Sequence, residues 1–263
     1  MTEPFRISRL LANEEETRVL AMDLAMAVQP HDIVTLEGDL GSGKSTLARA
    51  LIRAIAEDDR LEVPSPTFAL VQPYDLKRLP VVHADLYRVS SHDEIAELGW
   101  DEVSDKALLL VEWPDRLGGA LSGDRLEIEL SLAPGRGPNA RNAVLTGHGA
   151  WAARLARMSA LRGFLNNAGW GGSLRRHLQG DASSRSYERL LDGQRRAVLM
   201  NAPRKPDGPP VKNGLPYSRI AHLAEDMVPF VAMAEGLRDI GLSTPEIEAV
   251  DLDQGFLIIE DLG

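Results

Sequence analysis

Apolar residues in the first 150 positions follow two different periods. Several short, mostly apolar runs have the length of buried strands. Between them lie stretches in which apolar residues recur every three or four positions, the spacing of one helix face. We expect strands over 5–10, 32–38, 81–89, 107–113, 124–133 and 142–149, and helices over 14–28, 44–57 and 91–100. Strands separated by helices predict an α/β fold with a mainly parallel sheet covered on both faces.

The pattern changes near residue 150, which we take as a boundary between domains 1–150 and 151–263. The second region has fewer apolar runs and a loop rich in Pro, Gly and Lys. We expect helices over 151–170 and 220–241, a hairpin of strands over 185–191 and 195–203, and a last strand over 255–262. This mixture predicts a smaller α+β domain.

Composition narrows the class of protein. The 263 residues are 44% hydrophobic and 26% charged, values typical of a soluble globular protein, and no apolar run is long enough to span a bilayer. The N-terminus does not have the pattern of a signal peptide, and the absence of Cys excludes disulfides, so we expect a cytoplasmic protein. Residues 1–150 carry 15 basic against 25 acidic side chains, which argues against direct tRNA binding.

A phosphate-binding motif lies between a predicted strand and a predicted helix. The sequence GDLGSGKST contains Gly-x4-Gly-Lys-Ser. In such a loop the backbone N–H groups surround the β-phosphate, Lys44 is placed at the β- and γ-phosphate oxygens, and the Ser45 hydroxyl ligates Mg²⁺. The residues expected at the nucleotide are Gly38, Asp39, Leu40, Gly41, Ser42, Gly43, Lys44, Ser45 and Thr46.

Two acids, Asp85 and Glu112, lie toward the carboxyl ends of predicted strands, the sheet edge where α/β folds bind their ligands. One is expected to hold Mg²⁺ through water while the other orients the attacking water, so both join Ser45 as candidate metal residues. Thr67 lies in a Pro-containing loop after the phosphate-binding helix, where switch loops bring a Thr to the metal and the γ-phosphate. His83 shares a strand face with Asp85, although a lone His is more often structural.

The absence of two kinds of motif narrows the choice of nucleotide and of reaction. No Asn/Thr-Lys-x-Asp motif follows a strand, and Asp115–Gly118 matches Asp-x-x-Gly only after the last predicted parallel strand, so guanine specificity is unsupported. The Arg-rich lid of a small-molecule kinase has no counterpart beyond Arg136 and Arg141. ATP is therefore the expected nucleotide. Three roles stay open at this point: an ATPase acting on partners, a metabolite kinase, and a nucleotide-dependent binding module.

Four stretches occur in order across nearly all of residues 5–150: LEGDLGSGKSTLAR, SPTFALVQPY, HADLYR and LVEWPDR. Together they make the first domain resemble the TsaE family, the P-loop ATPases of the bacterial machinery that makes threonylcarbamoyladenosine in tRNA. The resemblance implies that Lys44 and Ser45 serve the phosphates and Mg²⁺, that Asp85 and Glu112 are the site carboxylates, and that Thr67 is the switch-like residue. It also matches Asn13 and Arg136 to residues near the nucleotide.

The same resemblance implies how the ATPase is used. The family works with a TsaD-like transferase subunit and its TsaB-like paralogue, and ATP hydrolysis is expected to reset their complex. An acidic domain agrees with docking on proteins rather than on tRNA.

The second region resembles the N-terminal lobe of aminoglycoside-phosphotransferase-like sugar kinases, through LQGDASSRSYERLLDGQRRAVLMNAP. The resemblance implies that Ser183–Ser186 lie on a nucleotide loop between two strands and that FLIIEDLG leads into the hinge. AVLMNAP lacks the Lys usual on the third strand, and no His-x-Asp-x4-Asn catalytic loop occurs in the sequence. We therefore expect a truncated, inactive lobe, with a non-catalytic α+β appendage as the alternative.

Overall fold

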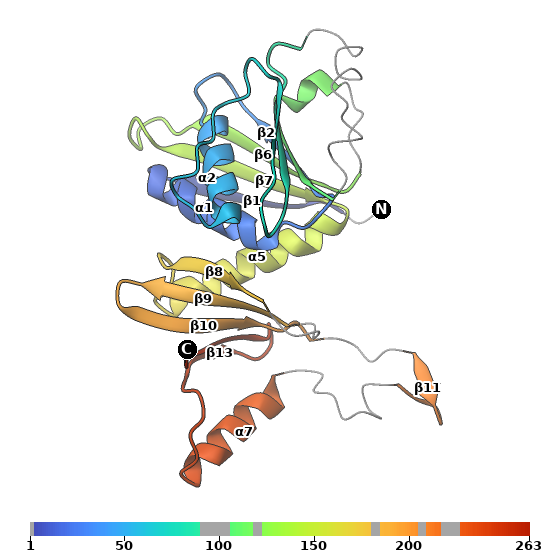
Figure 1. Ribbon diagram of the computed structural model, residues 1–263, viewed down its shortest axis with the longest axis vertical. Helices are drawn as coiled ribbons and strands as arrows, with labels where there is room; N and C mark the ends of the chain where they lie inside the picture. The colour runs from blue at the N-terminus through green and yellow to red at the C-terminus, as the bar shows by residue number, and fades with distance from the viewer. Residues whose placement is uncertain (1–2, 90–105, 118–122, 180–184, 205–208, 217–226) are drawn as a thin grey trace. The chain divides into compact units, whose positions relative to one another are not determined.

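The computed structural model describes residues 3–89, 106–117, 123–179, 185–204, 209–216 and 227–263 (Figure 1). The chain divides into two compact units, Met1–Ser159 and Ala160–Gly263. The division falls inside helix α5 (Ala150–Asn167), which begins where the sequence pattern changes. The helix predicted over 91–100 lies outside the described residues.

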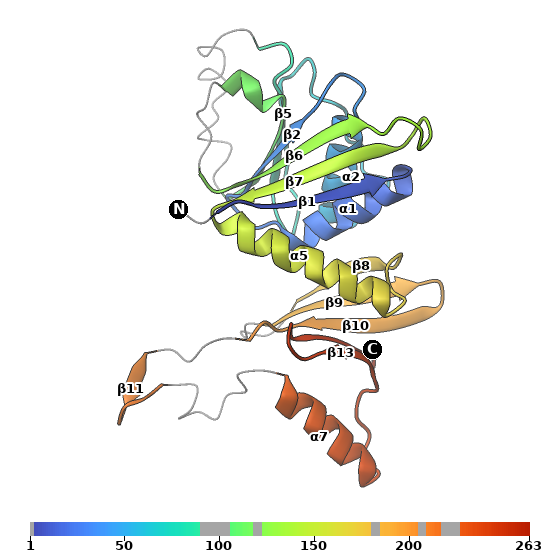
Figure 2. The same ribbon diagram turned by 180° about the vertical axis from the view of Figure 1, so that it is seen from behind.

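The first unit is built on a seven-stranded sheet with the order β1-β7-β6-β2-β5-β4-β3. Its strands are β1 (Phe5–Leu11), β2 (Ile33–Glu37), β3 (Val71–Tyr74), β4 (Val81–Asp85), β5 (Leu108–Glu112), β6 (Arg125–Leu132) and β7 (Arg141–His148). Strands β6, β2, β5 and β4 run parallel, whereas β1, β7 and β3 each pair antiparallel with their neighbours. Figure 2 shows β1, β7 and β6 side by side at one edge of this sheet.

This arrangement corrects the prediction of a mainly parallel sheet. The fold is a mixed α/β sheet, and only its core is parallel. The physical reason is the length of the connections. The turn PGRGPN between β6 and β7, and the few residues between β3 and β4, are too short for a parallel crossover and allow only an antiparallel return.

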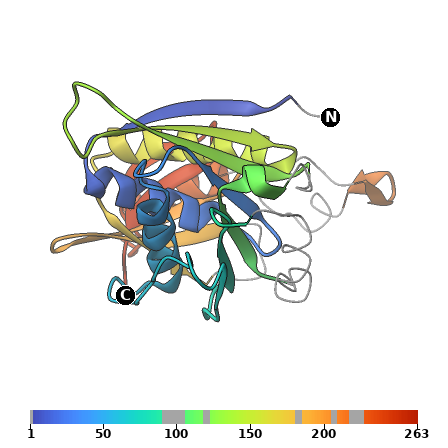
Figure 3. The ribbon, with the colours of Figure 1, turned by 90° about the horizontal axis from the view of Figure 1, so that it is seen from above.

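Helices α1 (Glu14–Ala27) and α2 (Lys44–Ala56) pack against each other on the first unit (Figure 3). The Asn13 side chain caps α1 by accepting a hydrogen bond from the Glu16 backbone N–H at 3.0 Å. Three glutamates in the first turn of α1 favour the positive end of the helix dipole. Leu20, Leu24 and Leu51 are fully buried in the core that these helices share with the sheet.

The interior strand β5 is apolar from Leu108 to Val111 because both of its faces are buried. Leu108 and Leu110 belong to the core under α1 and α2, and Leu109 and Val111 belong to a second core on the opposite face. A strand covered on both faces has no solvent-facing side, so it shows no alternation. A short 3₁₀ helix, η1 (Pro114–Leu117), follows it.

The second unit contains a five-stranded sheet with the order β13-β14-β10-β9-β8, in which every pair is antiparallel. Its strands are β8 (Leu174–Leu178), β9 (Ser186–Asp192), β10 (Arg195–Asn201), β13 (Ile247–Asp251) and β14 (Phe256–Glu260). A small pair, β11 (Pro210–Lys212) with β12 (Leu215–Pro216), and helix α7 (Val228–Asp239) complete the described elements. The predicted β9–β10 hairpin is confirmed, whereas β8 and β13 were not predicted.

A buried ion pair lies in this second sheet. The guanidinium of Arg175 donates to both carboxylate oxygens of Glu188, at 2.6 and 2.9 Å, and both side chains are almost fully buried. Two parallel hydrogen bonds compensate part of the cost of removing both charges from water.

Candidate nucleotide-binding site

The Gly-rich loop connects β2 to α2, and two of its glycines are required by geometry. Gly38 has φ of +131°, and a Cβ at that position would overlap the carbonyl oxygen of Leu130. Gly43 has φ of +105° and directly precedes Lys44, the first residue of α2. Only glycine adopts these positive φ angles without strain. The glycines at 38 and 43 therefore allow the chain to turn from strand β2 into helix α2. The loop therefore ends with its N–H groups at a helix N-terminus, where anions bind.

Lys44 is held inside this loop. Its Nζ donates to the carbonyl oxygens of Gly38 at 2.7 Å and Asp39 at 2.9 Å, and lies 3.8 Å from the centroid of the Trp113 ring. Burial lowers the pKa of the Lys44 ammonium, and the nearby carboxylates of Glu112 and Asp85 partly oppose that shift. The site thus contains a buried cation whose partners are mostly neutral carbonyls and a π face, ready to receive phosphate oxygens.

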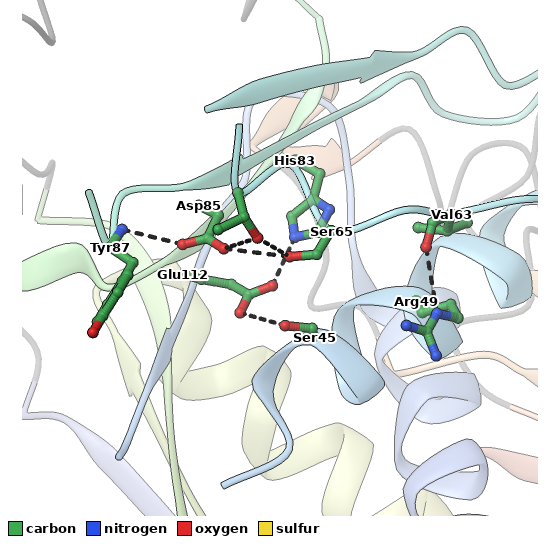
Figure 4. A network of polar contacts seen from close by, with 9 residues as sticks. Ser45, Arg49, Val63, Ser65, His83, Asp85, Tyr87 and Glu112 are labelled. Carbon is green, nitrogen blue, oxygen red and sulfur yellow. Dashed lines mark hydrogen bonds and ion pairs between the residues drawn. The ribbon is translucent and has the colours of Figure 1, made fainter. Parts of the chain in front are cut away.

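Glu112, at the end of β5, contacts the start of α2 through Ser45 and strand β4 through His83 (Figure 4). The Ser45 hydroxyl donates to its Oε2 at 2.9 Å, and the Nε2 atom of His83 lies 2.9 Å from its Oε1. Glu112 and His83 are both 1% exposed. With Glu112 as an ionised carboxylate, which only accepts, His83 donates from Nε2. One oxygen of the buried Glu112 carboxylate therefore binds the Ser45 hydroxyl, a candidate ligand of the metal, and the other oxygen binds the His83 imidazole.

Asp85 forms a second polar cluster beside the first. It lies directly opposite Glu112 in the β4–β5 register, at the carboxyl ends of two parallel strands. Its Oδ2 is 3.3 Å from the hydroxyls of both Ser65 and Thr67, which contact each other at 3.0 Å. Its Oδ1 accepts the Tyr87 backbone N–H at 3.1 Å. The loop that contains Thr67 is therefore anchored to the carboxylate that the sequence predicts as catalytic.

A cavity of about 170 Å³ lies beside the phosphate-binding loop. It is bounded by residues of β1 and α1, of the loop and α2, and of the β6–β7 hairpin. The lining residues are Leu11, Glu14, Thr17, Ser42, Gly43, Thr46, Leu130, Asn139 and Arg141. It adjoins the place where a phosphate would meet the α2 N-terminus, so it has the position required for the nucleoside part of a nucleotide.

The structure brings most of the predicted residues together and separates two of them. Lys44, Ser45, Asp85, Glu112 and Thr67 form the contacts described above, and Leu40 is exposed at the tip of the loop. Two other predicted residues lie apart from these contacts. Asn13 is occupied as the α1 cap, next to the cavity residue Glu14. Arg136 is exposed on the β6–β7 turn, and no hydrogen bond or ion pair of its side chain is found within the described ranges.

Two contacts were not predicted. Ser65 binds Asp85, and Arg141 donates to the loop backbone. The only sequence signal for Ser65 is its place in the SPTF stretch, and for Arg141 its basic character near the end of the hairpin turn.

The donor set suits a hard divalent cation. Within the part of the chain that the structure describes, no group of three or more His, Asp or Glu side chains could hold a metal by itself. A P-loop site does not need one, because Mg²⁺ retains waters and takes its remaining ligands from one or two protein oxygens and from phosphate. The Ser45 hydroxyl and the Glu112 and Asp85 carboxylates provide such oxygens.

The fold and this site define a P-loop nucleotide-binding protein. Residues 11–139 match the family model of the threonylcarbamoyl adenosine biosynthesis protein TsaE. The relatives agree, so the chain belongs to the TsaE family, a nucleotide-binding ATPase family of tRNA threonylcarbamoyladenosine biosynthesis. The prediction of a TsaE-like function for the first region is confirmed.

Two similar curated proteins illustrate the match. The chain is 40% identical over 123 residues to the tRNA threonylcarbamoyladenosine biosynthesis protein TsaE of Rickettsia felis, covering 47% of this chain and 71% of that protein. It is 38% identical over 122 residues to the protein of the same name from Bacillus subtilis, covering 46% of this chain and 75% of that protein. A solved structure, titled crystal structure of Bacillus subtilus YdiB, is 26% identical, covers 61% of this chain and 99% of its own, and has a TM-score of 0.49.

Among the described residues, no helix has the length and apolar character needed to cross a membrane.

Proposed function

We propose that the first unit hydrolyses ATP with Mg²⁺ and couples this turnover to partner proteins of tRNA threonylcarbamoyladenosine synthesis. The observation that carries the proposal is the shared carboxylate of Glu112. It accepts a hydrogen bond from the hydroxyl of Ser45, the residue after the P-loop lysine, and its other oxygen contacts His83. A carboxylate held against this hydroxyl is what a P-loop enzyme needs on the metal side of its phosphates.

In this proposal Glu112 and Asp85 have different roles. Ser45, with Glu112 through water, would hold Mg²⁺, which when bound supplies positive charge to the β- and γ-phosphate oxygens. Asp85, together with Thr67 and Ser65, would accept a hydrogen bond from the attacking water and align it. Lys44 would exchange its carbonyl partners for phosphate oxygens, because a charged acceptor is the stronger partner.

The nucleoside is expected in the cavity lined by Thr17, Thr46 and Asn139. The glycines and the α2 N-terminus would receive the phosphates, and the positive end of the helix dipole supports their charge. We also propose that the bound nucleotide is ATP and that Asn13 and Arg136 lie near it.

Phosphate release from ATP tests the central claim. The wild-type chain should hydrolyse ATP in Mg²⁺ and lose this activity in EDTA. Lys44→Ala should lose nucleotide binding because the Lys44 ammonium is the buried charge that lies inside the loop, bound to the Gly38 and Asp39 carbonyls. Hydrolysis at the wild-type rate by Lys44→Ala would refute the proposal.

The proposed partners are a TsaD-like transferase and a TsaB-like paralogue. The support is family membership, together with the acidic charge of residues 1–150, which suits protein rather than tRNA surfaces. The ATPase rate should rise when both partners are added and should not respond to tRNA alone. A chain that binds ATP but shows no turnover with or without the partners would instead be a nucleotide-dependent binding module.

For the second unit we propose a lobe of the phosphotransferase-like kinases without catalysis of its own. In support, β8, β9 and β10 form consecutive antiparallel neighbours, and β14, whose last residue is the Glu of EDLG, pairs with β10. With the P-loop disabled by Lys44→Ala, labelled ATP should transfer no phosphate to amino sugars. Transfer under these conditions would contradict the proposal and support a metabolite kinase.

A further inference from the structure

Arg141 joins two parts of the site that are far apart in the sequence. It is the first residue of β7, directly after the turn that leaves β6. Its Nε donates to the carbonyl oxygen of Ser42 at 3.0 Å, and one terminal nitrogen, Nη2, donates to that of Gly41 at 3.3 Å. The other terminal nitrogen, Nη1, donates to the carbonyl oxygens of Pro138 at 2.9 Å and Ala140 at 3.0 Å. One guanidinium therefore fastens the phosphate-binding loop to the hairpin turn.

These bonds fix the direction of two peptide units in the loop. In a planar trans peptide, C=O and N–H point in opposite directions. With the Ser42 carbonyl turned toward Arg141, the N–H of Gly43 faces the other way. With the Gly41 carbonyl turned toward Arg141, the N–H of Ser42 is directed back into the loop, where it donates to Asp39 at 3.1 Å. Arg141 thus holds one N–H in the closed turn and presents the next one outward.

The charge of Arg141 adds to this effect. A guanidinium stays positive at any relevant pH. Among the described residues, no carboxylate forms an ion pair with Arg141, and its side chain lines the cavity together with Ser42 and Gly43. A Lys could not replace it, because a single ammonium cannot span carbonyls on two segments as a planar fork does.

We infer that Arg141 is a positioning residue for nucleotide binding: it pre-arranges the loop's peptide units for phosphate before the nucleotide arrives. The inference rests on the proposed function of the loop. Arg141 lies just outside the residues that match the family model, 11–139.

The test is binding of a fluorescent ADP analogue in EDTA, so that no metal contributes. Arg141→Met and Arg141→Lys should each weaken binding about tenfold or more, the size expected when hydrogen bonds from a charged group are lost. Arg60→Met removes the same charge from an exposed position and serves as the control, with affinity expected within about twofold of wild type. Wild-type affinity in Arg141→Met, or full recovery in Arg141→Lys, would overturn the inference, because a Lys keeps the charge and loses the fork.

Amide hydrogen exchange in the nucleotide-free protein provides a second measurement. Exchange over 41–45 should be faster in both Arg141 variants than in wild type, while the buried strand β2 stays protected to the same degree. Unchanged exchange over 41–45 would also overturn the inference. If the wild-type chain does not bind ADP at all, the proposed function fails, whereas the exchange measurement still decides whether Arg141 holds the loop.

Discussion

Replacing Glu112 with Gln is the sharpest test of how the carboxylates divide the chemistry. Gln keeps the shape and hydrogen-bonding ends of Glu but removes the charge. Its amide oxygen can still accept from His83, and its NH₂ can donate to the Ser45 hydroxyl, which rotates to accept. Glu112→Ala would instead leave the buried His83 donor and the half-buried Ser45 hydroxyl without their partner, at about 1–3 kcal/mol for a buried donor, so its effect on folding would obscure the chemistry.

The expected magnitude follows from the contacts. Hydrogen bonds to a charged group contribute about 1.5–3 kcal/mol, and Glu112 makes two, one of which leads to the hydroxyl that would ligate Mg²⁺. Losing about 3 kcal/mol of this stabilisation in the transition state slows turnover roughly a hundredfold. Binding of ADP in EDTA should stay within a few-fold of wild type, because Glu112 faces the metal side rather than the loop N–H groups.

The assay compares the dissociation constant for ADP with and without Mg²⁺, together with single-turnover phosphate release. Asp85→Asn is the matched variant, since Asp85 lies opposite Glu112 but contacts Thr67 and Ser65. Glu112→Gln should lose both turnover and the gain in affinity that Mg²⁺ provides. Asp85→Asn should lose turnover and keep that gain. If the two variants exchange these phenotypes, the assignment of metal side and water side is wrong.

Three further outcomes follow from the structure. Burial lowers the Lys44 pKa, so ADP affinity should fall with rising pH before the ordinary value of 10.5 is reached; titration from pH 7 to 10 checks this, and a flat profile would contradict it. Gly38→Ala should lower both the melting temperature and ADP affinity because its Cβ has no space and its φ is positive, whereas Gly123→Ala, with open space, should do neither. Burial raises the Glu127 pKa, but hydrogen bonds led by the one from His148 outweigh it and leave the pKa below 4.5. That stabilisation is present above pH 4.5 and lost as pH falls through the lowered value, so in denaturant unfolding Glu127→Gln should flatten this acid-side loss.

Local pattern was sufficient for the centre of the first unit. The β2-loop-α2 segment could be predicted because each part follows a local rule: a buried apolar strand, glycines where φ is positive, and a helix with one apolar face. Asp85 and Glu112 could be placed together because carboxyl ends of parallel strands share one edge of a sheet. The short PGRGPN turn indicates the antiparallel return from β6 to β7, but local pattern did not reveal that β1 pairs antiparallel with β7 or that residues 71–74 form the strand β3.

Two of the strands that escaped prediction, β8 and β13, are the two edges of the second sheet. Along β13, half-buried positions alternate with exposed ones, and β8 contains Arg175, Arg176 and His177 in its middle. An edge strand buries little of its surface and often carries charge, so its apolar pattern is weak. These strands become recognisable only through their hydrogen bonds to β9 and β14.

His83 and Arg141 mark the limit of sequence reasoning in a different way. Period-two spacing put His83 on the face of Asp85, yet its partner is Glu112, because β4 and β5 are neighbours and the longer imidazole reaches across. Arg136 lies in the turn between β6 and β7 and Arg141 directly follows that turn, and only the β6–β7 register decides that Arg141 faces the loop. Each residue fixes a different part of the site: His83 the carboxylate on the metal side, Arg141 the peptide units on the phosphate side. Since they share no hydrogen-bond partner, turnover and nucleotide affinity should be separable by substitution, which a site formed by the P-loop alone would not allow.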